Sequence, residues 1–98
     1  MWHPRGMSID QIHSFVTVAE EGAIVRAALK LHISQPPLTR KIAALEDELG
    51  VRLFDRQPRG VALTDDGARF LPYARGVLAA VAEAESVFTQ ADGCATTS

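Results

Sequence analysis

The sequence has little of what catalysis, metal binding or export usually requires. It contains one cysteine, Cys94, which cannot form a disulfide within the chain, so we expect a reducing compartment, the cytoplasm. Its three histidines, that single thiol and the lack of a Gly-rich phosphate loop give no catalytic constellation. We therefore predict no enzyme activity, no metal site and no cofactor.

Long apolar runs are also missing. No segment is long enough to span a bilayer, and residues 1–6 lack the apolar stretch of a signal peptide, so we expect no membrane contact. We interpret Met7 as the true start and residues 1–6 as an N-terminal extension. The 98 residues, of which 47% are hydrophobic and 22% charged, suit one small domain folded around a core.

Charge is present but unevenly distributed. The formal net charge is −2, yet residues 26–41 contain no acid. The cations of this block are Arg26, Lys30, Arg40 and Lys41, and two more, Arg56 and Arg59, come soon after it. A local basic face on an acidic protein is typical of nucleic-acid binding. The alternative is that the block forms an ordinary solvated surface.

Two helices are predicted near the N-terminus. Ser8 and Gln11 have the spacing of a capping box at the start of a helix over residues 8–21. Gly22 is a plausible stop for this helix. A short second helix is predicted over residues 23–31.

The third helix is predicted over residues 35–49, with Ser34 as its N-cap and Gly50 at its end. Pro36 and Pro37 would then occupy the positions N2 and N3. The N–H groups of these positions have no partner within a helix, so the two prolines cost no intrahelical hydrogen bond. The tip of this helix would therefore be compact, apolar and stiff.

A β-hairpin and a long helix complete the expected fold. Residues 51–64 predict the hairpin, with "RQPRG" as its turn, and Thr64 is a candidate N-cap for a helix over residues 65–91. We expect that helix to pair with a second copy of the chain; the alternative is that it folds back on its own domain. Residues 92–98 are predicted to be a tail. The pairing rests on apolar residues that alternate four- and three-residue spacing, as in a heptad seam: Phe70, Ala74, Val77, Val81, Ala84, Phe88 and Ala91.

Two helices joined by a tight turn and followed by a hairpin predict a mainly α fold. It is a winged helix-turn-helix over residues 7–64, with three helices and a hairpin wing, followed by a long dimerising linker helix. In this motif the second helix of the pair enters the major groove of DNA. Arg40 could then read a guanine edge, Gln35 and Thr39 could reach bases, and Arg59 could enter the minor groove.

Phosphate contacts position a protein on DNA without reading its sequence. We expect such contacts from Ser34, Lys30, Lys41, Arg56 and Thr64. The rival hypothesis is a protein-interaction module whose long helix forms a coiled coil and which has no role on DNA.

Three stretches carry a resemblance to a known family: "FVTVAEEG", "RAALKLHISQPPLTRKIAALEDELGVRLFDR" and "RGVALTDDGARFLPYAR". Through them, residues 7–75 resemble the N-terminal DNA-binding domain of LysR-type bacterial transcriptional regulators. The resemblance implies double-stranded DNA as partner, an interrupted palindrome as site, and a homodimer made by antiparallel linker helices, joined into tetramers in the full-length protein. It implies base and groove contacts from Gln35, Pro36, Pro37, Thr39, Arg40 and Arg59.

The sequence departs from the family pattern at two points. Ala23 stands where the family usually has Ser or Thr, which removes a helix cap worth about 1 kcal/mol. The family also continues into an effector-binding domain, whereas this sequence ends at Ser98. We therefore expect it to bind DNA without responding to a small-molecule inducer.

Overall fold

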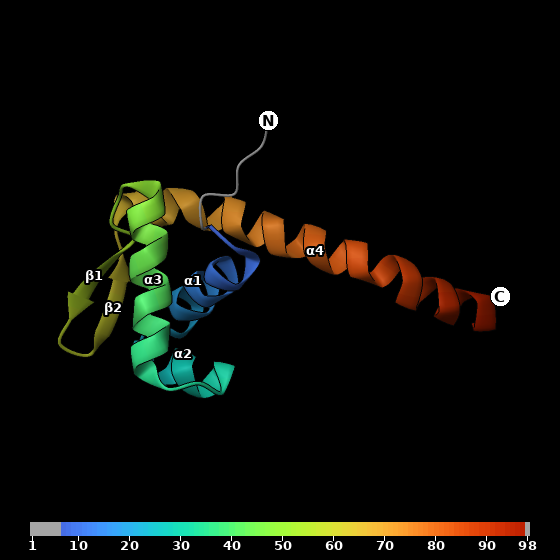
Figure 1. Cartoon of the computed structure of the whole chain (residues 1–98), viewed down its shortest axis with the longest axis horizontal. Coiled ribbons are helices and arrows are strands. Elements are labelled where there is room, and N and C mark those ends of the chain that lie inside the picture. Colours follow the sequence, from blue (N-terminus) through green and yellow to red (C-terminus); the bar gives the residue numbers. More distant parts are fainter. Residues whose placement is uncertain (1–6, 98) are drawn as a thin grey trace.

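The computed structural model describes residues 7–97, and the side chains of residues 7–88. Within these residues the first three helices and the hairpin form one body, from which the last helix projects as a long arm (Figure 1). The expected mainly α fold with a hairpin wing is confirmed. The elements are α1 (Ile9–Glu21), α2 (Ile24–Leu31), α3 (Gln35–Leu49), β1 (Phe54–Gln57), β2 (Gly60–Leu63) and α4 (Asp65–Thr97).

The ends of the first helices follow the local sequence. The hydroxyl of Ser8 accepts the Gln11 N–H at 3.1 Å, and Oε1 of Gln11 accepts the Ser8 N–H at 2.8 Å, so the predicted capping box is confirmed. Gly22 and Gly50 end α1 and α3 in the left-handed conformation that glycine adopts without strain. By contrast, the N-cap residue of α2 is Ala23, which forms no side-chain cap, as the missing hydroxyl predicts.

The core is built around α1. The side chain of Phe15 is fully buried, and its ring centroid lies 5.3 Å from that of Phe54 in β1 and 5.2 Å from that of Phe70 in α4. One residue of α1 therefore contacts both the hairpin and the long helix. The other buried apolar side chains of the core cluster are Ile12, Val16, Val18, Ala27, Ala28, Leu38, Ile42, Leu45, Leu53 and Ala74.

The hairpin is an antiparallel pair whose register runs from Phe54 opposite Leu63 to Gln57 opposite Gly60. Residues 58–59 therefore form its tip, and Arg59 lies at the end of the wing, as predicted. The strands are shorter than the predicted hairpin over residues 51–64, because residues 51–53 form the connection out of α3.

The hairpin is fixed against the corner between α1 and α2. The Val61 N–H donates to the carbonyl oxygen of Gly22 at 3.0 Å. A Cβ on Gly60 would lie 2.2 Å from the same oxygen, and φ of Gly60 is +154°, so a side chain cannot be accommodated at this position. The close approach of two backbones therefore sets where the wing leaves the body.

One side of the first turns of α4 packs on the body. Ala74 is fully buried in the core, and Phe70 contacts Phe15, while Leu71 and Leu78 pack partly against the same cluster. The prediction that Ala74 lies at a dimer interface is therefore wrong, and Phe70 also faces its own core. For this part of the helix the alternative of folding back on its own domain applies, because a heptad spacing does not identify which neighbour covers it.

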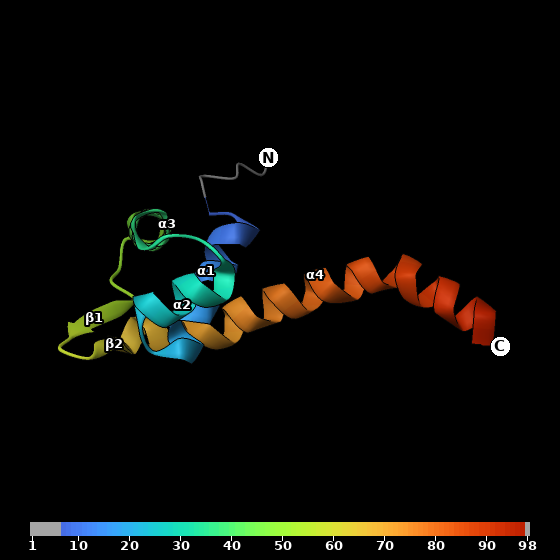
Figure 2. The same cartoon turned by 90° about the horizontal axis from the view of Figure 1, so that it is seen from below.

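The rest of α4 extends away from the body, as Figures 1 and 2 show from two directions. It runs to Thr97, so residues 92–97 are helical and not the predicted tail, and the helix continues past residue 91. Phe88 is 77% exposed on this arm. Beside it runs an uncovered apolar face at four- and three-residue spacing, which we call the outer stripe: Tyr73, Val77, Ala80, Ala84 and Val87.

The outer stripe differs in phase from the predicted seam. It shares Val77 and Ala84 with that seam, but it includes Tyr73, which is 74% exposed, in place of the buried Ala74. Although the stripe is apolar, no helix in the described part of the chain combines the length and hydropathy needed to cross a membrane.

Candidate nucleic-acid interface

Helix α3 has an N-cap residue, Ser34, but no side-chain hydrogen bond caps its N-terminal end. Ser34 has the extended conformation of an N-cap, but its side chain accepts no hydrogen bond from the helix. A serine cap normally accepts the N–H of N2 or N3. Pro36 and Pro37 occupy these positions and have no N–H, so the predicted side-chain cap cannot form. The Ser34 hydroxyl is left exposed at the tip of the helix.

The residues predicted to read DNA lie together on the outer side of this tip. Gln35, Pro36 and Arg40 are exposed, and Pro37 and Thr39 are half-buried at the edge of the same surface. Leu38 on the opposite side is fully buried, and it fixes the rotation of α3 about its axis. The core therefore determines which side chains of α3 face outward.

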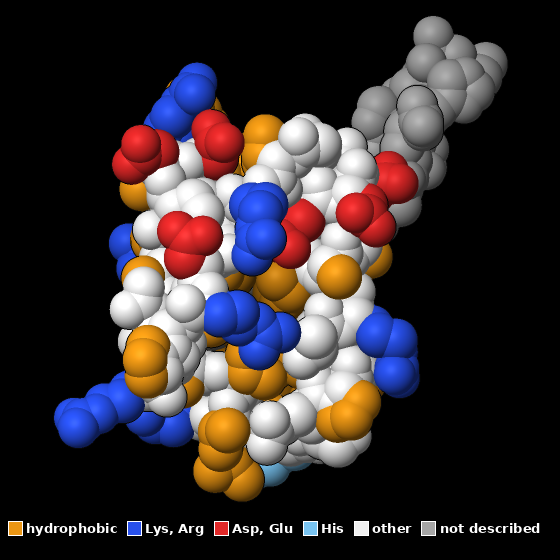
Figure 3. Space-filling model, turned by 90° about the vertical axis from the view of Figure 1, so that its left-hand side faces the viewer, with side chains coloured by type: hydrophobic (Ala, Val, Ile, Leu, Met, Phe, Trp, Pro, Cys, Tyr) orange, Lys and Arg blue, Asp and Glu red, His pale blue; other side chains and the backbone are white. Residues whose placement is uncertain are grey.

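An open groove separates α3 from the hairpin. Thr39, Ala43 and Asp47 line it from α3, and Arg56 and Val61 line it from the hairpin. Figure 3 views this side of the molecule: Lys and Arg side chains lie over the hollow and on both flanks, while acidic side chains gather towards the upper end. The groove thus has basic walls near the tip of α3 and becomes acidic along it.

Three arginines around this groove have no internal partner. Arg40 on α3, Arg56 on β1 and Arg59 at the wing tip are exposed, and none makes a hydrogen bond or ion pair with another described residue. A guanidinium held on a rigid element without an internal partner is suited to bind a phosphate or a base edge. These side chains are therefore the strongest candidates for contacts outside the chain.

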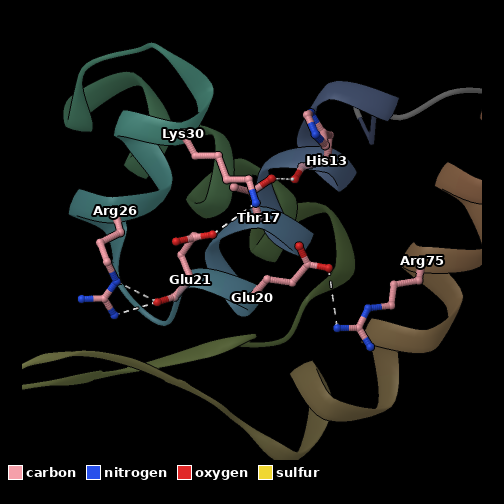
Figure 4. A network of polar contacts seen from close by, with 7 residues as sticks. All are labelled: His13, Thr17, Glu20, Glu21, Arg26, Lys30 and Arg75. Carbon is pink, nitrogen blue, oxygen red and sulfur yellow. Dashed lines mark hydrogen bonds and ion pairs between the residues drawn. The ribbon is translucent and has the colours of Figure 1, made fainter.

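The other cations of the basic block are engaged within the molecule, as Figure 4 shows for Arg26 and Lys30. Arg26 donates from Nε and Nη2 to the carbonyl oxygen of Glu21 at 3.1 and 2.7 Å, which caps the end of α1. Lys30 pairs with the Glu21 carboxylate at 3.3 Å, and Lys41 pairs with that of Asp10 at 2.7 Å. The block is therefore not one free basic face. Because exposed ion pairs contribute only about 0–1 kcal/mol, Lys30 and Lys41 could still exchange their carboxylates for a phosphate.

Thr64 is the N-cap of α4, as predicted, because its hydroxyl oxygen accepts the Gly67 N–H at 3.0 Å. The same hydroxyl donates its one proton to the carbonyl oxygen of Arg52. A phosphate oxygen needs a donor, and Thr64 has none left. We therefore do not assign a phosphate contact to Thr64.

Two residues of this surface escaped sequence reasoning. Arg52 lines the groove and donates from Nη2 to the carbonyl oxygen of Phe54 at 3.2 Å. Glu46, also in the groove wall, accepts the backbone N–H groups of Leu53 and Phe54. No sequence signal identified Glu46, because a glutamate beside other acids on a helix reads as a solvated surface residue.

The profile of a family described as "Bacterial regulatory helix-turn-helix protein, lysR family" matches residues 9–68. The chain is 57% identical over 72 residues to the HTH-type transcriptional regulator ClcR of Pseudomonas putida, covering 74% of this chain and 24% of that protein. The chain thus spans about a quarter of the length of this curated relative. The relative is a transcriptional regulator and not an enzyme, in agreement with the prediction from the sequence.

Two solved structures are similar over nearly the whole described body. The CbnR_DBD–DNA complex matches with a TM-score of 0.80 and 42% identity, covering 87% of this chain and 98% of that one. The complex of BenM_DBD with catB site 1 DNA matches with a TM-score of 0.81 and 40% identity, covering 86% of this chain and 94% of that one. Both similar chains were solved on DNA.

The missing side-chain bond at Ser34 gives a test of the helix tip. Ser34→Ala should change the free energy of unfolding by less than about 0.5 kcal/mol, since no cap is lost. The matched variant Ser8→Ala removes a formed capping box and should cost about 1 kcal/mol. Urea denaturation followed by circular dichroism measures both. An equal loss for the two variants would show that Ser34 does cap α3.

Proposed function

Because the chain belongs to the lysR family of bacterial regulatory helix-turn-helix proteins, we propose that it binds double-stranded DNA for a transcription regulator. The observation that carries this proposal is a set of three exposed arginines that have no partner among the described residues: Arg56, which lines the groove between α3 and the wing, Arg40 on α3 and Arg59 at the wing tip. The two similar chains solved on DNA support it. A protein that binds bacterial operators works in the cytoplasm.

In this proposal α3 enters the major groove with its N-terminal half. Arg40 reads a guanine edge through its planar fork, and Gln35 and Thr39 reach neighbouring bases. Pro36 and Pro37 present an apolar tip that can contact thymine methyl groups. The exposure of Gln35, Pro36 and Arg40 on one side of the helix supports this assignment.

Arg59 at the tip of the wing enters the adjacent minor groove, because the negative potential of a narrow minor groove attracts arginine. The sugar–phosphate strand between the two grooves then crosses the hollow beside Arg56. Ser34, Lys30 and Lys41 supply further phosphate contacts around the tip of α3. The exposed hydroxyl of Ser34 supports its assignment, whereas each lysine must first release the carboxylate with which it pairs.

We assign residues 7–64 to the DNA-binding unit and α4 to dimerisation with a second copy of the chain. The outer stripe is symmetric enough to pair with itself in antiparallel fashion. The small residue Ala80 would lie at the centre, Val77 would meet Ala84 of the partner subunit, and Tyr73 would meet Val87 of the partner subunit. Val81, half-buried, and Phe88 flank this contact. A two-fold dimer reads two half-sites, which fits an interrupted palindrome.

The full-length protein would add an effector-binding domain after α4, through which a small-molecule inducer acts and through which dimers join into tetramers. The chain spans about a quarter of the length of the relative ClcR.

Base reading by Arg40 can be separated from its charge. Arg40→Ala should weaken binding to a site selected from random duplex DNA by about tenfold or more, and should weaken binding to random duplex DNA much less. Arg40→Lys keeps the charge but loses the bidentate fork, so it should weaken only the selected site. Fluorescence anisotropy at several salt concentrations measures both affinities, which should fall steeply with salt. Equal losses on both DNAs would contradict base reading by Arg40.

Pairing through the outer stripe is tested by a charge placed on it. Val87→Glu should convert dimers to folded monomers, because Val87 is 58% exposed and contributes nothing to the core. Ala82→Glu adds the same charge on the opposite, exposed side of α4 and should leave the dimer intact. Sedimentation equilibrium and circular dichroism check mass and fold. A Val87→Glu protein that stays dimeric would contradict this interface.

A further inference from the structure

One acidic side chain links α3 to the wing. Oε2 of Glu46 accepts the N–H of Leu53 at 2.7 Å and that of Phe54, the first residue of β1, at 3.3 Å. Leu53 is 0% and Phe54 6% exposed, so these N–H groups have little access to water. Within the described residues, no other hydrogen bond or ion pair joins α3 to residues 53–63.

This contact lies where it can control the groove. Thr39, Ala43 and Glu46 follow one another at spacings of four and three residues, so they share the side of α3 that forms one wall. Arg56 stands on the opposite wall, two residues beyond Phe54 in the same strand. A shift of β1 relative to α3 therefore changes the distance between the two walls directly.

The other strand is held from elsewhere. The Val61 N–H bonds to the Gly22 carbonyl at 3.0 Å, which attaches β2 to the corner between α1 and α2. That contact fixes the hairpin to the body but not to α3. Among the described residues, Glu46 alone supplies a directed polar link between α3 and β1. Hydrogen bonds to a charged acceptor are roughly twice as strong as bonds to a neutral one.

We infer that Glu46 is a positioning residue for DNA binding: it sets the spacing between the base-reading helix and the wing, and thus aims Arg56 and Arg59. The inference rests on the proposed function, since it names what holds the two parts of the DNA-binding face in register. The inference also predicts whether removal of the Glu46 carboxylate weakens or tightens DNA binding. An acid near DNA repels phosphates, so by charge alone its removal would tighten binding. A lost link would weaken binding instead.

Glu46→Ala and Glu48→Ala form a matched pair, because each removes one negative charge from the C-terminal half of α3. Glu48 is exposed and makes no hydrogen bond or ion pair with the described residues. On a site selected from random duplex DNA by the unaltered chain, Glu46→Ala should bind about tenfold more weakly, since two enclosed donors lose their acceptor. Glu48→Ala should bind as tightly as the unaltered chain or more tightly. If the Glu46→Ala variant binds this DNA more tightly, as the Glu48→Ala variant does, the inference is overturned.

A double-mutant cycle separates positioning from general loss of stability. With the wing misplaced, Arg59 should already be ineffective, so adding Arg59→Ala to Glu46→Ala should cost much less than Arg59→Ala alone. Arg40→Ala should cost as much binding free energy in the Glu46→Ala background as it does alone, because α3 keeps its own packing. Additive losses with both arginines would mean that Glu46 supports the fold only.

Glu46→Gln keeps an oxygen acceptor without the charge, and it should give an affinity between those of the unaltered chain and Glu46→Ala. If Glu46→Ala does not fold, the same cycle is run with Glu46→Gln, and additive losses of binding free energy there overturn the inference equally.

If the unaltered chain binds no DNA, the proposed function fails. The link is then tested without DNA, since the Leu53 and Phe54 amide protons should exchange faster in Glu46→Gln than in Glu48→Ala, and equal exchange would contradict it.

Discussion

Burial of the Phe15 side chain is the constraint on which the positions of the other elements depend. Its ring packs on Phe54 of the hairpin and on Phe70 of α4, so a single residue of α1 fixes the wing and the long helix together. Protein interiors are close-packed, and neither element can move without disturbing this contact. Because Leu38 is buried in the same core, the rotation of α3 is set by it as well. The core thus sets which side of α3 faces outward and where the wing joins the body, and Glu46 links α3 to the first strand of the wing.

Polar contacts divide the cations of this surface into two groups. Arg26, Lys30 and Lys41 pair with backbone or carboxylate groups of α1, whereas the unpartnered arginines stand around the groove. Glu20 adds an ion pair to Arg75 of α4 at 3.7 Å, visible in Figure 4. A net charge of −2 is therefore compatible with a basic DNA-binding face, because arginines without a partner among the described residues stand around the groove near the tip of α3, while acidic side chains gather towards its upper end (Figure 3).

Sequence reasoning predicted the parts that depend on near neighbours in the chain. The capping box at Ser8 and the glycine stops at Gly22 and Gly50 involve contacts within a few residues, and the helices begin and end close to where these signals stand. Contacts between distant residues were beyond it. The pairing of Lys41 with Asp10 and the link from Glu46 to β1 require the folded arrangement. The covered face of α4 was misjudged for the same reason, since periodicity finds a stripe but not its neighbour.

The central claim is that two copies of a rigid helix-and-wing surface read DNA together. Selection of bound sequences from a pool of random duplex DNA by the unaltered chain, followed by sequencing, tests this most directly. We expect enrichment of two half-sites related by two-fold symmetry and separated by bases that vary, because α4 holds two reading helices at a fixed distance. Sequences no different from the starting pool, or a single half-site without a symmetric partner, would contradict it.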